Sequence, residues 1–115
     1  MSVTIYHNPR CSKSRQTLAL LQDKGIEPHI IEYLNTPPDK KTLKTILGKL
    51  GLTARELMRK KEAAYKDNKL DDDSLDEEQL IDAMLENPVL IERPIVLANG
   101  KAAIGRPPEN VLEIL

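Results

Sequence analysis

The 115-residue chain contains one cysteine, three tyrosines, no tryptophan and no phenylalanine. With so few aromatic side chains, its core is expected to consist of Leu, Ile, Val, Ala and Met. A single cysteine excludes an internal disulfide, which fits a reducing compartment. No apolar run reaches the roughly 18 residues of a membrane-spanning helix, and the N-terminus does not resemble a signal peptide. We therefore expect a cytoplasmic protein that does not enter a membrane.

The chain also has no marked excess of positive or negative charge. The 17 basic and 18 acidic residues give a net charge of −1, so the composition does not imply a general affinity for nucleic acid. The distribution is uneven, because residues 1–22 contain basic but no acidic side chains. The acidic run at residues 71–78 is interpreted as a solvated loop and helix start.

The first third of the chain predicts a β-α-β unit. Its parts are strands at residues 3–6 and 29–34 and a helix from Ser12 or Ser14 to Lys24, ended by Gly25. Three helices are expected next. They are marked by the spacing of Leu43, Ile46, Leu47 and Leu50, by a capping box that begins at Thr53, and by a second capping box that begins at Ser74.

The C-terminal third predicts a β-β-α unit. Asn99-Gly100 joins strands at 95–97 and 102–104, because Asn-Gly favours the tight turn of a hairpin. A last helix should begin at Pro107-Pro108 and carry Val111, Leu112 and Leu115. The predicted fold is α/β, with a four-stranded mixed sheet, flanking helices and a helical insertion at about 38–92. We expect residues 1–115 to form a single domain.

Cys11 lies where the first predicted strand passes into the first helix, close to Arg10, Lys13 and Arg15. Unpaired N–H groups at a helix start and nearby cations stabilise a thiolate, which is the nucleophilic form of cysteine. The same groups attract a tetrahedral oxyanion. A buried structural cysteine is the alternative. The run from Cys11 to Ser14 has the spacing of a Cys-x-x-Cys motif with Ser14 in place of the second cysteine.

Several segments are characteristic of one family: residues 6–15, Tyr33-Leu34 with Pro37-Pro38, and residues 55–60, 92–96, 105–107 and 112–115. On these segments the chain resembles the ArsC-like, glutaredoxin-linked arsenate reductases of the thioredoxin-like superfamily, in their YfgD-type branch. The resemblance therefore spans nearly the whole chain, and it implies a thioredoxin-like fold with a helical insertion.

The resemblance also implies roles for individual residues. Cys11 would attack arsenate, while Arg59, Arg93 and Arg106 surround the oxyanion. His7 would tune the cysteine, and Pro94 would be a cis-proline beside the sulfur. Arg10, Ser14 and Arg15 are supporting candidates. Taken singly, each arginine is also compatible with an ordinary surface position, and His7 with a structural histidine.

The resemblance predicts reduction of arsenate, or a similar oxyanion, to arsenite with glutathione as co-substrate and glutaredoxin as partner. No bound cofactor or metal is expected, since the chain lacks a Cys/His cluster and a phosphate-binding glycine motif. Two alternatives stay open: a regulator or protein-binding module on the same fold, and a general glutathione-dependent thiol oxidoreductase. Arg10 and Lys13 depart from the usual uncharged residues of the family and make the loop more basic.

Overall fold

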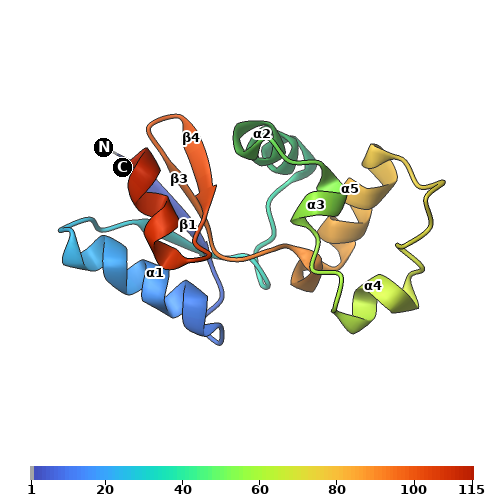
Figure 1. Cartoon of the computed structure of the whole chain (residues 1–115), viewed down its shortest axis with the longest axis horizontal. Helices are drawn as coiled ribbons and strands as arrows, with labels where there is room; N and C mark the ends of the chain where they lie inside the picture. The colour runs from blue at the N-terminus through green and yellow to red at the C-terminus, as the bar shows by residue number, and fades with distance from the viewer. Residues whose placement is uncertain (1) are drawn as a thin grey trace. The chain divides into compact units, whose positions relative to one another are not determined.

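The computed structural model describes residues 2–115 and divides them into two compact units. The first contains residues 2–36 and 93–115, and the second contains residues 37–92. The second unit is thus inserted in sequence between the two halves of the first (Figure 1). That the two units together form a single domain stays a prediction.

The first unit is built on a four-stranded mixed sheet. Its elements are β1 (Val3–His7), α1 (Ser12–Asp23), β2 (His29–Glu32), β3 (Ile95–Ala98), β4 (Lys101–Ile104) and the 3-10 helix η2 (Pro108–Ile114). The strand order is β2-β1-β3-β4. Strand β1 runs parallel to β2 and antiparallel to β3, and β3 is antiparallel to β4. The predicted α/β, thioredoxin-like fold is confirmed.

One face of this sheet is packed by α1 and η2, which also contact each other (Figure 1). The buried cluster consists of Val3, Ile5, Leu21, Val96, Ala98, Val111 and Ile114. The expectation of a purely aliphatic core is wrong, because all three tyrosines, Tyr6, Tyr33 and Tyr65, are buried as well. A tyrosine ring is largely apolar, so it packs in a core when its hydroxyl finds a partner.

The predicted ends of α1 are only partly correct. The helix begins at Ser12, but Cys11 occupies the N-cap position, and Ser14 lies inside the helix with its side chain engaged elsewhere. Gly25 follows the helix with φ +77°, which confirms it as the stop.

The predicted hairpin is confirmed, since Asn99 and Gly100 both have positive φ angles, 53° and 75°. The last helix differs from the prediction. It is a 3-10 helix, which buries Val111 and Ile114 at a spacing of three and leaves Leu112 exposed.

The second unit is helical. It contains α2 (Lys40–Leu50), α3 (Ala54–Leu57), α4 (Ala63–Asp67), α5 (Glu77–Glu86) and the 3-10 helix η1 (Pro88–Leu90). Four α-helices thus replace the three expected. The predicted second helix stops at Leu57, because Met58 is extended and forms an isolated β-bridge with Ile91.

The capping box at Thr53 is confirmed, whereas the one predicted at Ser74 is wrong. Helix α5 is capped by Asp76, which exchanges hydrogen bonds with Gln79, and the Ser74 hydroxyl donates to Asp72 instead. Within the described residues, no helix is long and apolar enough to cross a membrane.

Candidate active site

The register of the sheet brings three segments of the first unit to one end. Tyr6, near the end of β1, pairs with Ile95 at the start of β3, and Ile95 pairs with Ile104 at the end of β4. The loop before α1, the segment before β3 and the segment after β4 therefore leave the sheet side by side. These segments carry Cys11, Arg93 and Arg106.

Cys11 is 8% exposed. Burial of the thiol raises the pKa of Cys11, but four other contributions outweigh it. They are hydrogen bonds from the backbone N–H groups of Ser14 and Lys13 and the positive charges of Arg93 and Arg106. The net pKa is lower than that of an ordinary cysteine, so the fold favours the thiolate.

The cations that act on Cys11 differ from those expected on sequence. Arg10, Lys13 and Arg15 are its neighbours in the chain, yet the charges that lower its pKa belong to Arg93 and Arg106. Lys13 contributes through its backbone N–H. Arg15 donates from Nη1 to the carbonyl oxygen of Pro9 at 2.9 Å, which braces the loop.

The contacts of Arg106 include one with the Cys11 sulfur and one with the Arg93 segment. Its Nη2 lies 3.5 Å from the Cys11 sulfur, and its Nε donates to the carbonyl oxygen of Arg93 at 2.8 Å. The second contact ties the two arginine segments together. An anion that approaches the sulfur therefore meets a guanidinium already held in place.

Pro94 and Gly105 are the chain neighbours of Arg93 and Arg106, and they contact each other. The Arg93–Pro94 and Arg106–Pro107 peptide bonds are both cis. The N–H of Gly105 donates to the carbonyl oxygen of Pro94 at 3.0 Å. A Cβ atom at Gly105 would collide with Thr17 Oγ1 and lie 2.9 Å from Pro94 Cγ. The sequence analysis did not predict this close packing between Gly105 and Thr17. Its one signal was the presence of a glycine directly before Arg106.

His7 contacts Ser14, whose backbone N–H donates to the Cys11 sulfur, and the role of His7 in tuning the cysteine stays a prediction. The His7 Nδ1 and Ser14 Oγ atoms are 2.7 Å apart, and Ser14 Oγ also accepts the N–H of Asn8 at 3.0 Å. Burial lowers the pKa of His7, the charge of Glu32 raises it, and the charge of Arg15 lowers it. The net pKa lies below the ordinary value of histidine, so the neutral imidazole predominates at pH 7. The tautomer of the neutral imidazole decides whether His7 Nδ1 or the Ser14 hydroxyl donates in this contact. The pair holds the helix start whose N–H groups bind the sulfur.

Arg59 belongs to the second unit. Its N–H donates to the carbonyl oxygen of Leu90 at 2.8 Å, and its guanidinium forms a 2.6 Å ion pair with Glu62. Its Nη1 also donates to the carbonyl oxygen of Val89 at 3.3 Å. Its role in binding an oxyanion stays a prediction.

In chemical terms, the first unit combines a cysteine sulfur with N–H donors and two guanidinium groups. Such groups stabilise both the thiolate and an anion that reacts with it. Among residues 2–115, no group of three or more His, Cys, Asp or Glu side chains is placed to hold a metal ion.

Comparison with known proteins agrees with this arrangement. The model of the ArsC family matches residues 6–114. Uncharacterized protein YfgD of Escherichia coli K12 is 63% identical, over 98% of this chain and 96% of its own length. An arsenate reductase of Neisseria meningitidis (serogroup B) is 54% identical, over 98% and 97%. The solved arsenate reductase of Vibrio cholerae superposes with a TM-score of 0.97 at 57% identity, over 100% and 98%. The chain therefore belongs to the ArsC family.

Proposed function

We propose that this protein reduces arsenate to arsenite and that Cys11 is the nucleophile. The observation that carries the proposal is a thiol at a helix start, with Arg106 Nη2 3.5 Å from its sulfur and with backbone N–H groups and guanidinium charges that lower its pKa. Relatives named arsenate reductase, 44–54% identical to this chain, support the choice of substrate. A free thiol that must stay reduced fits a cytoplasmic location.

The first step joins the sulfur to arsenic. Arg93 and Arg106 bind the oxyanion by charge-assisted hydrogen bonds. The Cys11 thiolate attacks As(V) and forms an S–As bond, while one oxygen of arsenate takes up protons and leaves as water. The two arginines stabilise the negative charge on the remaining oxygens during this exchange.

The second step needs an outside thiol. Reduction of As(V) to As(III) takes two electrons, and Cys11 is the only cysteine of the chain. Glutathione is the proposed co-substrate: it adds to the arsenic adduct and displaces a second oxygen. A thiol of glutaredoxin then joins the glutathione sulfur in a disulfide. The electron pair of the bond between arsenic and the glutathione sulfur stays on arsenic and reduces it to As(III). Water then adds to arsenic and displaces the Cys11 sulfur, which frees arsenite.

The proposal is tested by arsenate turnover with glutathione and glutaredoxin. Wild type should produce arsenite, and Cys11→Ser should produce none although it folds, because an alcohol is not ionised near pH 7. Transfer of electrons from glutathione to a disulfide substrate but not to arsenate would favour a general thiol oxidoreductase. Absence of both activities, with glutaredoxin active on a control substrate, would favour the protein-binding module.

A further inference from the structure

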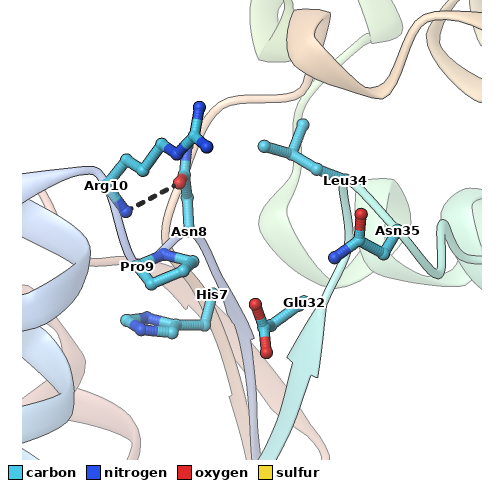
Figure 2. A pocket seen from close by; sticks show the side chains of 7 residues that line it. All are labelled: His7, Asn8, Pro9, Arg10, Glu32, Leu34 and Asn35. Carbon is cyan, nitrogen blue, oxygen red and sulfur yellow. Dashed lines mark hydrogen bonds between the residues drawn. The ribbon is translucent and has the colours of Figure 1, made fainter.

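A pocket of about 340 Å³ lies beside the active loop, on the first unit. One wall is the loop at residues 7–10, and the other consists of Glu32, Leu34 and Asn35 after β2. Figure 2 shows Arg10 and Glu32 on opposite sides of this hollow, with the Asn35 amide directed into it. The mechanism described above does not use this pocket.

The walls of the pocket carry opposite charges that do not neutralise each other. Arg10 and Glu32 are both exposed, and among the described residues neither forms an ion pair. The Arg10 N–H donates to Asn8 Oδ1 at 3.0 Å, which holds the loop that presents the guanidinium. One cation facing one anion across a small hollow matches a ligand that bears a carboxylate and an ammonium on one carbon.

We propose that this pocket binds the γ-glutamyl end of glutathione, with its carboxylate on Arg10 and its ammonium on Glu32. The inference rests on the proposed function, which requires an external thiol. Asn35 offers amide donors and an acceptor to the same end of the ligand. Leu34, 39% exposed, provides apolar surface for the methylene groups of the γ-glutamyl chain.

The position of the pocket suits delivery of a thiol to Cys11. Arg10 directly precedes Cys11, and consecutive Cα atoms lie about 3.8 Å apart. An extended tripeptide spans roughly 10 Å, so a ligand held at one end extends beyond the pocket wall. The γ-linkage leads the cysteinyl residue away from the held carboxylate and ammonium, which leaves its thiol free to react.

Binding is tested without turnover by titrating the protein with S-methylglutathione, which keeps both charged groups but lacks a thiol. Amide NMR signals of Leu34 and Asn35 should shift in wild type. Arg10→Gln and Glu32→Gln should each weaken binding roughly ten- to a hundredfold, as expected for a lost charge-assisted hydrogen bond. Lys24→Gln and Glu27→Gln remove the same charges from exposed positions outside the pocket and should bind as wild type does.

Turnover of arsenate gives the second readout, with glutathione compared against 2-mercaptoethanol, which has no charged groups. The ratio of the two kcat/KM values should fall about tenfold or more in the pocket variants and stay constant in the controls. Equal binding of S-methylglutathione by Arg10→Gln, Glu32→Gln and wild type would overturn the inference. If wild type reduces arsenate with neither thiol, the proposed function fails, and the titration alone then decides whether the pocket binds glutathione.

Discussion

At the scale of single residues, the reactivity of Cys11 depends on a balance between burial and charge. Burial alone would keep the sulfur protonated. The N–H groups of α1 and the guanidinium groups of Arg93 and Arg106 reverse that effect. Arg106 lies 95 residues from Cys11 in the chain, so this balance exists only in the folded protein.

The first prediction concerns the ionisation of Cys11. The rate of alkylation by iodoacetamide should rise with pH through a midpoint below about 8.5, the value of an unperturbed cysteine. Arg106→Gln should move the midpoint upward, because it removes a charge that favours the thiolate. Lys13→Gln should leave it nearly unchanged, since Lys13 acts through its backbone. A wild-type midpoint at or above 8.5 would refute this account of the thiol.

The second prediction separates oxyanion binding from support of the fold. In a Cys11→Ser background, Arg93→Ala or Arg106→Ala should weaken arsenate binding about ten- to a hundredfold, for a loss of roughly 1.5–3 kcal/mol. Lysine should restore only part of the affinity, because it lacks the planar fork of arginine. Calorimetric titration measures the effect.

The matched control for these arginines is Lys101→Ala. Lys101 pairs with Ala98, at the end of the hairpin remote from the Ile95–Ile104 pair, so its loss should not change arsenate affinity. The Arg106 variant should also lose a little stability, about 0.5–1.5 kcal/mol, with its bond to the Arg93 carbonyl. Unchanged arsenate affinity in both alanine variants would exclude the assignment.

At the scale of elements, the site depends on close packing between α1 and the segments that flank the hairpin. Thr17, in α1, is fully buried and contacts Gly105. Thr17 Oγ1 also donates to the carbonyl oxygen of Lys13 at 2.8 Å, so its position is fixed by its own helix. The absence of a side chain at residue 105 lets the Arg106 segment approach this helix.

The third prediction is therefore a contrast between two glycines. Gly105→Ala should lower the free energy of unfolding by about 1–3 kcal/mol, because its methyl group overlaps Thr17 and Pro94. Gly48→Ala should raise it by up to about 1 kcal/mol, since residue 48 lies inside α2 with open space around it. Urea unfolding of both variants measures the difference. A neutral or stabilising Gly105→Ala would contradict the packing described.

Elements were predictable from sequence where the signal is local. Asn99-Gly100 and the Thr53 capping box encode their own backbone geometry, and the structure contains both. The errors lie where packing decides among local options. Asp76 rather than Ser74 caps α5, and η2 adopts a 3-10 spacing that turns Ile114 rather than Leu112 toward the core. Neither choice is visible in a short stretch of sequence.

At the scale of the whole molecule, the chain order separates residues that the sheet brings together. The second unit is inserted between β2 and β3, yet β3 pairs with β1 in the centre of the sheet. Cys11 could be predicted from its position at a strand-to-helix junction. Arg93 and Arg106 could be predicted only from the family resemblance, because strand register determines their place and no local pattern encodes it.

The pocket at Arg10 and Glu32 could not be predicted, since its walls come from two separate segments.

The measurement that tests the central claim most directly is arsenate reduction with and without an external thiol, followed by mass spectrometry of the intact protein. With arsenate and glutathione, wild type should carry an adduct on Cys11 and turn over repeatedly once glutaredoxin is added. The adduct should be absent in Cys11→Ser. Without any external thiol, arsenite production should stop, because one cysteine cannot supply two electrons by closing a disulfide. Sustained turnover in the absence of thiol, or an undiminished adduct in Cys11→Ser, would contradict the account.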